Sequence, residues 1–259
     1  MNELDPRMNE RKLITIASGK GGVGKTWASV TLAHTLAREG KRVLLFDGDL
    51  GLANVDIQLG LMPQSDIGDV ISGEAQLRDV VVRFNDSGDK GSFDVIPGKS
   101  GSGALGSLSR ATLLEIRTSL IEIASDYDYV LLDLAAGIDP SVMALSAHKG
   151  RVVVVMTSDP TSLTDAYAFI KINVQRNPKL NLGIVVNNVS NNQEGKRAYE
   201  AIRRACEGFL KITPPLLGII KTDTKVVDAI RAQTPLLARH PQSEAGSNML
   251  ALANVIIGG

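Results

Sequence analysis

Short apolar runs alternate with longer amphipathic stretches along most of this 259-residue chain, and this rhythm limits its fold more than any other feature. The apolar runs lie at residues 13–18, 42–46, 93–98, 129–134, 151–157, 182–187 and 216–220. Most are apolar at consecutive positions, as expected of strands buried on both faces. The amphipathic stretches, which we predict to be helices, lie at 25–39, 109–125, 162–176, 193–210 and 223–233. The pattern predicts an α/β fold with a mainly parallel, twisted sheet and helices on both of its faces.

We expect one domain over residues 1–259, with a polar N-terminal tail at 1–11 and a C-terminal helix at 243–259. Segments rich in glycine and serine at 85–92 and 98–107 are predicted to be loops rather than a domain boundary. The N-terminus lacks an apolar signal region, and no stretch is long enough to span a bilayer. We therefore expect a cytoplasmic protein.

The composition excludes several kinds of function. Lys and Arg together number 28, as do Asp and Glu, so the net charge gives no general affinity for nucleic acid or membranes. Cys206 is the only cysteine, which rules out disulfides within the chain and cysteine-rich metal clusters. His34, His148 and His240 are far apart and show no ligand spacing, so packing or surface roles are expected.

The segment "SGKGGVGKT" at residues 18–26 fits the phosphate-binding pattern G-x-x-x-x-G-K-[ST], between a predicted strand and a predicted helix. Glycines let backbone N–H groups turn toward phosphate oxygens, and the helix N-terminus adds partial positive charge. Lys25 would reach the β- and γ-phosphates, and Thr26 would coordinate Mg²⁺. The alternative, a glycine-rich turn with an incidental lysine, does not explain the match of motif and context. The residues expected to contact nucleotide here are Gly21, Gly22, Val23, Gly24, Lys25, Thr26 and Trp27.

Three aspartates follow buried strands. Asp133 ends "YVLLDL", at the edge where open α/β sheets bind ligands, and suits a Walker B acid that supports Mg²⁺. Asp47 and Asp49 would share one face of a continuing strand, where paired acids can hold metal-bound water and orient a nucleophilic water. The alternatives are a helix cap for Asp133 and a polar turn for the other two.

Several segments together resemble one family. "KGGVGKT" resembles the deviant Walker A motif of the MinD/ParA ATPases, which are P-loop NTPases of the SIMIBI class. "DGDLGLANVDIQLGL" (47–61), "DLAAGID" (133–139) and the segment 216–245 are similar to its MinD and FlhG (FleN) branch, with FlhG the more similar. The similarity covers nearly the whole chain from Lys12 to about Ala245.

The resemblance implies an ATPase that binds ATP or ADP with Mg²⁺ and forms a homodimer with ATP between its subunits. Lys20 would be the signature lysine that contacts phosphate across the dimer, and Asp49 the acid implicated in hydrolysis, so the implied catalytic set is Lys20, Lys25 and Asp49. The implied metal set is Thr26, Asp47 and Asp133. Asn187 would contact adenine, with a capping role as the alternative. Lys221 and Asp223 belong to the loop that closes over the base.

Two departures from the family pattern matter. Trp27 follows Thr26, where many relatives carry a small or polar residue, and we expect it to pack under the loop. The chain ends in "NMLALANVIIGG" and has no Lys or Arg after Arg239. An interfacial helix would place cations on its polar face. We therefore expect a core-packing helix and no membrane contact through it, although members of this branch can lie peripherally at the inner membrane.

The leading hypothesis is a nucleotide-switched regulator of spatial organisation, concerned with flagellar placement or number, whose hydrolysis is slow and stimulated by partners. The second is a ParA-like ATPase that binds DNA without sequence preference. Its basic residues would be Lys196, Arg197, Arg203, Arg204 and Lys211. A biosynthetic ATP-dependent enzyme on the same fold is the third, although no feature requires a second-substrate pocket. A nitrogenase-iron-protein-like role is excluded because it needs paired cysteines.

Overall fold

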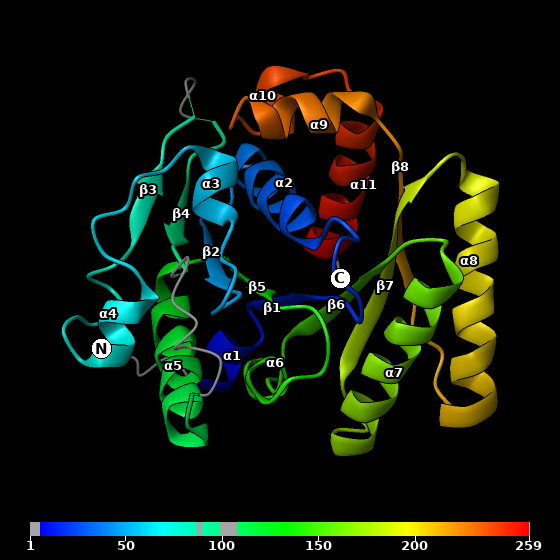
Figure 1. Cartoon of the computed structure of the whole chain (residues 1–259), viewed down its shortest axis with the longest axis horizontal. Coiled ribbons are helices and arrows are strands. Elements are labelled where there is room, and N and C mark those ends of the chain that lie inside the picture. Colours follow the sequence, from blue (N-terminus) through cyan, green and yellow to red (C-terminus); the bar gives the residue numbers. More distant parts are fainter. Residues whose placement is uncertain (1–5, 87–89, 99–107, 259) are drawn as a thin grey trace.

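One eight-stranded sheet runs through the computed structural model, which describes residues 6–86, 90–98 and 108–258 (Figure 1). Its strand order is β3-β4-β2-β5-β1-β6-β7-β8. The strands are β1 (Leu13–Ala17), β2 (Val43–Gly48), β3 (Val82–Phe84), β4 (Phe93–Ile96), β5 (Tyr129–Leu134), β6 (Arg151–Met156), β7 (Asn181–Val189) and β8 (Leu216–Lys221). Neighbouring strands are parallel except β3, which pairs antiparallel with β4. The predicted α/β fold with a mainly parallel sheet is confirmed.

Alternate side chains of each strand enter two separate cores, one on each face of the sheet. Leu13 and Leu44 belong to the core that includes residues of α5, α6, α7 and α8. Ile14 and Leu45 belong to the core that includes residues of α2, α3, α9 and α11. The helices are α1 (Pro6–Glu10), α2 (Lys25–Arg38), α3 (Val55–Leu59), α4 (Ile67–Ser72), α5 (Arg110–Ile123), α6 (Pro140–Leu145), α7 (Pro160–Arg176), α8 (Asn192–Ala205), α9 (Thr224–Arg231), α10 (Leu236–Arg239) and α11 (Glu244–Gly258). Helices therefore cover both faces, as predicted.

Several short elements depart from the expectations. Residues 6–10 form the helix α1, where we expected a polar tail. The edge strand β3 was not predicted, because it is three residues long and only Phe84 is buried. The short helices α3, α4, α6 and α10 are at most six residues long, which is too short for a helical period to show in the sequence. Of the two predicted loops, residues 87–89 and 99–107 lie outside the described parts.

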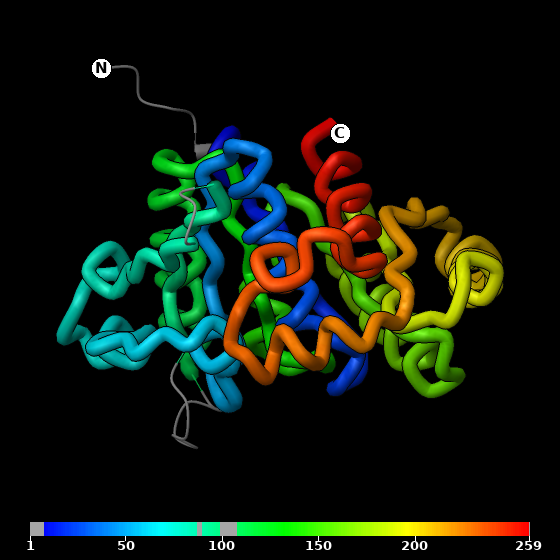
Figure 2. The backbone as a smooth tube through the Cα atoms, turned by 90° about the horizontal axis from the view of Figure 1, so that it is seen from above, coloured from blue at the N-terminus to red at the C-terminus, as the bar shows by residue number. Residues whose placement is uncertain are grey.

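The C-terminal helix packs into the core. Met249, Leu252 and Ile256 of α11 are at most 5% exposed and belong to the core on the α2 face. Figure 2 shows α11, in red, beside α2, in blue, and the two helices are in contact. The expected core-packing role of this helix is confirmed. Within the described part of the chain, every helix is too short or too polar to cross a membrane.

Candidate functional site

The loop between β1 and α2 leaves backbone N–H groups free to face a ligand. Gly22 and Gly24 have φ angles of 77° and 85°, a left-handed conformation that glycine adopts without steric cost. Gly24 begins α2 without any side-chain hydrogen bond at the cap. The N–H groups of the first helical turn are therefore open to an anion, which the helix dipole also favours. This geometry suits the phosphates of a nucleotide.

A buried ion pair lies directly beneath this loop. Lys25 Nζ is 2.6 Å from Asp133 Oδ1, and the two side chains are 8% and 0% exposed. Ser29 Oγ donates to the same carboxylate oxygen at 2.9 Å. The other oxygen, Asp133 Oδ2, is buried and accepts no hydrogen bond from the described residues. Because a buried charged oxygen without a partner is costly, it indicates a ligand or bound water at this position.

Asp47 and Asp49 have separate surroundings. The strand β2 ends at Gly48, so the expected continuing strand with both acids on one face is wrong. Asp47 is 1% exposed and lies beside Asp133 in the sheet register. Its carboxylate accepts the backbone N–H groups of Asp49, Asn54 and Val55 at 2.9–3.2 Å. Burial, followed by the charge of Asp133, raises the pKa of Asp47 to about 7 against these hydrogen bonds. Asp47 thus shapes the turn that carries Asp49.

A cavity of about 530 Å³ opens over the loop and the first turn of α2. Lys25, Thr26 and Asp49 all line it. They are joined by Ser18, Gly21, Gly22, Gly24, Trp27, Leu52, Asn54, Gln58, Ala135, Ala136 and Ile230. The structure thus brings the predicted phosphate-contacting residues and the predicted hydrolytic acid to one cavity.

A second cavity of about 300 Å³ adjoins the first and shares Gly22, Gly24, Trp27 and Ile230 with it. Its other lining residues are Val23, Asn187, Asn188, Lys221, Thr222, Asp223, Thr224, Val226 and Val227. Apolar side chains of α9 thus meet the amides of Asn187 and Asn188 near the end of β7. A concave, partly apolar site with a few polar groups suits a planar base.

The residues predicted to contact the base also make hydrogen bonds and an ion pair that stabilise the walls of this second cavity. Asn187 Nδ2 donates to Val23 O at 2.8 Å, so this side chain fixes the phosphate loop. Lys221 Nζ is paired with Glu244 at 2.6 Å. Asp223 accepts the N–H groups of Lys225 at 3.0 Å and of Glu244 at 3.0 Å, which joins the starts of α9 and α11. These residues therefore organise the cavity as well as line it.

Trp27 is packed where both cavities meet. It is 6% exposed and belongs to the core on the α2 face, which confirms the expected packing. Its indole Nε1 is buried and has no hydrogen-bond partner among the described residues. The side chain also lines both cavities.

Lys20 is directed away from both cavities. Its ammonium group lies 2.5 Å from Thr161 Oγ1 and 3.4 Å from Asp159 Oδ2, at the start of α7. The side chain is 40% exposed, and Lys20 lines neither cavity. The two lysines of the loop therefore differ: Lys25 serves the cavity of its own chain, whereas Lys20 does not reach it.

The residues present fit a Mg²⁺ ion bound with nucleotide phosphates. Thr26 lines the first cavity, and Asp133 supplies the unpartnered oxygen below it. Among the described residues, no group of three or more His, Cys, Asp or Glu side chains could hold a metal without further ligands. In a P-loop site, phosphates and water complete the coordination of the ion. The carboxylate of Asp47, occupied by backbone N–H groups, fits an indirect role better than direct coordination.

Comparison with known proteins agrees with this site. The model of the CobQ/CobB/MinD/ParA nucleotide binding domain matches residues 14–236. The chain belongs to this family. The antiactivator FleN of Pseudomonas aeruginosa is 34% identical over 96% of this chain and 87% of its own length. The flagellum site-determining protein YlxH of Helicobacter pylori is 32% identical, covering 95% of this chain and 82% of its own.

The fold of this MinD/ParA-family chain also matches solved structures. The crystal structure of the cell division ATPase MinD of Pyrococcus furiosus superposes with a TM-score of 0.80 and 25% identity, covering 96% of this chain and 99% of that one. The chain is thus an ATP-binding P-loop ATPase of the MinD/ParA kind, with FleN among its relatives.

The sequence did not reveal several residues of the site. Ser29 lies four residues after Lys25 on α2, so helical spacing places both on one face. That spacing was a usable signal. The partners of Lys20 in α7 and the wall residue Ile230 come from distant parts of the chain, and no local pattern indicates them.

Proposed function

We propose that the chain is a Mg²⁺-dependent ATPase that dimerises when it binds ATP and acts as a switch in positioning another structure. The observation that carries this proposal is the division between the two lysines of one loop. Lys25 is buried against Asp133 at 2.6 Å, whereas Lys20 is 40% exposed beside α7 and contributes nothing to its own cavity. An exposed lysine outside the cavity of its own chain can instead reach phosphate in a facing subunit.

Apolar side chains around the cavities support such an interface. Leu52 is 73% exposed and lines the phosphate-side cavity, and Val227 is 51% exposed and lines the base-side cavity. Ile138, in the segment after Asp133, is 48% exposed. Exposed apolar groups beside a polar site are typical of a surface that another protein covers.

We propose flagellar placement or number as the process that the switch serves. The relatives FleN and YlxH, named as an antiactivator and a flagellum site-determining protein, support this. In this proposal the protein works in the cytoplasm, and α11, which is packed into the core, does not itself contact the inner membrane. Slow hydrolysis, accelerated by a partner, would return the dimer to monomers.

The second hypothesis, DNA binding through the basic segment, has weaker support. Arg203 is paired with Glu200 at 2.7 Å and with Glu207 at 2.5 Å. Lys211 donates to the carbonyl oxygen of Gly208 at 2.9 Å. Two of the five basic groups are therefore already engaged, which reduces the charge available to phosphates.

Light scattering of the purified chain with ADP and with ATP tests the proposal. We expect monomers with ADP, dimers with ATP and longer-lived dimers for Asp49→Ala. Lys20→Ala should bind ATP but stay monomeric. A wild-type protein that remains monomeric with bound ATP would refute the switch.

A further inference from the structure

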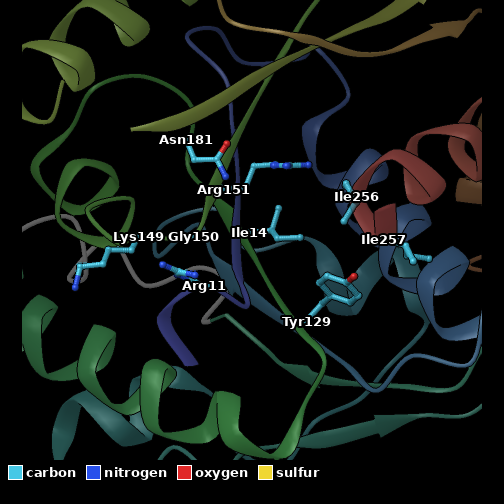
Figure 3. Close-up of a pocket in the computed structure, with 9 residues that line it drawn as sticks. All are labelled: Arg11, Ile14, Tyr129, Lys149, Gly150, Arg151, Asn181, Ile256 and Ile257. Carbon is cyan, nitrogen blue, oxygen red and sulfur yellow. The ribbon is translucent and has the colours of Figure 1, made fainter. Parts of the chain in front are cut away.

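A cavity of about 510 Å³ lies at the edge of the sheet opposite the nucleotide site (Figure 3). The nucleotide cavities lie beyond the carboxyl ends of the parallel strands, whereas this one is lined by residues at the amino ends of β5, β1, β6 and β7. The end of α11 closes one side with Ile256 and Ile257. The volume is within the usual range for small-molecule sites, about 300–1,000 Å³.

The sheet register brings its polar groups to one face. Arg151 pairs with Ile14 of β1 on one side and with Asn181 of β7 on the other. Residues directly opposite in neighbouring strands point to the same face. Figure 3 shows Arg11, Arg151 and Tyr129 arranged around Ile14, with Asn181 beside Arg151. Guanidinium, amide and phenol groups thus line a single cavity with an apolar wall.

Arg151 is a half-buried cation without a partner among the residues that the structure describes. Three arginines in the described ranges are half-buried, namely Arg117, Arg151 and Arg203. Arg117 donates to the carbonyl oxygens of Ala144 and Ala147, and Arg203 pairs with two glutamates. Arg151 makes no side-chain hydrogen bond or ion pair with any residue that the structure describes, nor does Arg11 beside it. A partly desolvated guanidinium usually has an acceptor, so Arg151, with none among the described residues, is available to an acceptor that a ligand supplies.

The charges around the cavity leave an excess of cations. Lys149 also lines it and is paired with Glu10 at 3.4 Å. No carboxylate is among the lining residues that the structure describes. Asp128, the acid next to Tyr129 along the chain, accepts the backbone N–H of Arg42 at 2.8 Å and pairs with its guanidinium at 3.3 Å. Arg11 and Arg151 therefore line the cavity with no opposite charge matched to them in the described part of the chain.

Hydrogen bonds of His148 and close backbone packing at Gly150 fix the chain on either side of this cavity's lysine and arginine. His148 Nδ1 accepts the N–H of Gly150 at 3.0 Å, and His148 Nε2 is 2.7 Å from Thr15 Oγ1. A Cβ on Gly150 would lie 2.0 Å from the carbonyl oxygen of Leu13, so the turn before β6 presses directly on β1. The backbone that carries Lys149 and Arg151 is thus fixed before any ligand binds.

We propose that this cavity binds a small organic phosphate. Its phosphate is bound by the guanidinium groups that line the cavity, those of Arg151 and Arg11, whose planar donors match phosphate oxygens. Tyr129 and Asn181 supply neutral donors, and Ile256 and Ile257 cover the apolar part of the ligand. The same phosphate chemistry is offered by a soluble phosphate ester and by the headgroup of a phospholipid.

Amide NMR spectra of the full chain, saturated with Mg²⁺ and ADP so that the P-loop is filled, test this site. Glycerol phosphate is the soluble probe, and vesicles of phosphatidylglycerol, compared with phosphatidylcholine, are the lipid probe. For a soluble ligand we expect saturable shifts at Arg151, Asn181 and Ile257. For a lipid we expect cosedimentation with the anionic vesicles only. Either response supports the phosphate site and identifies the source.

Two variants make the test specific. Arg151→Gln should weaken the response about tenfold or more, since it removes charge-assisted hydrogen bonds, and should leave ADP binding unchanged. Arg197→Gln, the same change at an exposed arginine of α8, should have no effect. Absence of a response to both probes, or equal loss in the two variants, would overturn the proposal. Amide shifts with sodium acetate equal to those with glycerol phosphate would also overturn the proposal, because they would show only non-specific screening of the arginine charges by anions. Dimerisation is not involved, so the result is independent of the proposed switch.

Discussion

Replacing Lys25 with Met should destabilise the nucleotide-free protein strongly, whereas the same change at Lys20 should have little effect. Lys25 Nζ lies 2.6 Å from Asp133 Oδ1, with side chains that are 8% and 0% exposed. Lys20 Nζ lies 3.4 Å from Asp159 Oδ2, with side chains that are 40% and 49% exposed. Both lysines belong to the same loop, so Lys20→Met is a matched control.

The magnitude follows from burial. At 2.6 Å and an effective dielectric constant of about 20, the attraction between Lys25 and Asp133 is about 6 kcal/mol. Loss of hydration of both charges offsets part of it, but Lys25→Met leaves Asp133 buried, with the Ser29 hydroxyl as its one remaining donor among the described residues. Breaking comparable buried pairs costs about 3–5 kcal/mol. We expect a loss of this size in the free energy of unfolding.

Urea denaturation without nucleotide, followed by circular dichroism, measures this loss. The double variant Lys25→Met, Asp133→Asn should recover part of it, because the neutral amide carries no unpaired charge. Equal stabilities of Lys25→Met and Lys20→Met would refute the reasoning. So would a double variant that is as unstable as the sum of the two single variants.

Three further predictions follow from buried residues. Leu252→Ala in α11, where Leu252 is 2% exposed, should cost about 2–4 kcal/mol of unfolding free energy. Leu250→Ala, at a residue 39% exposed, should change it by less than about 0.5 kcal/mol, and similar losses would contradict core packing of this helix. Burial lowers the pKa of His148 to about 4 from 6.5. The stability that the neutral, buried imidazole contributes to the folded state is therefore present above about pH 6.5 and is lost as the pH falls through about 4. His148→Gln should therefore remove about 3 kcal/mol of the acid-induced loss of stability, and an unchanged pH profile in urea titrations would oppose this. Trp27 is the only tryptophan and lines both cavities, so Mg²⁺ and ADP should change its emission, and constant emission with nucleotide bound would place the ligand elsewhere.

The sequence was informative where a local pattern reflects a physical need. Buried parallel strands require consecutive apolar residues, and these runs marked β1, β5, β6 and β7 to within two residues at each end. The phosphate loop requires glycines between a strand and a helix, and its Gly22 and Gly24 have the left-handed backbone that this implies. The C-terminal helix was predicted to pack in the core because it lacks cations, and it does.

The sequence was uninformative where tertiary contacts decide. Lys20 contacts Asp159 and Thr161, which lie about 140 residues later. The turn after β2 is set by Asp47 accepting three backbone N–H groups, which the spacing of Asp47 and Asp49 alone did not indicate. The cavity lined by Arg11 and Arg151 is formed by residues at the starts of strands that the folded sheet places side by side. Such relationships depend on strand order, which no local window contains.

Mixing two inactive variants tests most directly whether Lys20 serves the facing subunit. Lys20→Ala keeps Asp49, and Asp49→Ala keeps Lys20, so neither variant alone has a complete site. In a mixed dimer, the nucleotide on the Lys20→Ala subunit meets its own Asp49 and the lysine of its partner. We predict that ATP hydrolysis, measured as phosphate release, is absent for each variant alone and returns in the mixture. A mixture as inactive as its components, or a Lys20→Ala protein that hydrolyses ATP normally by itself, would contradict the proposed role of this lysine.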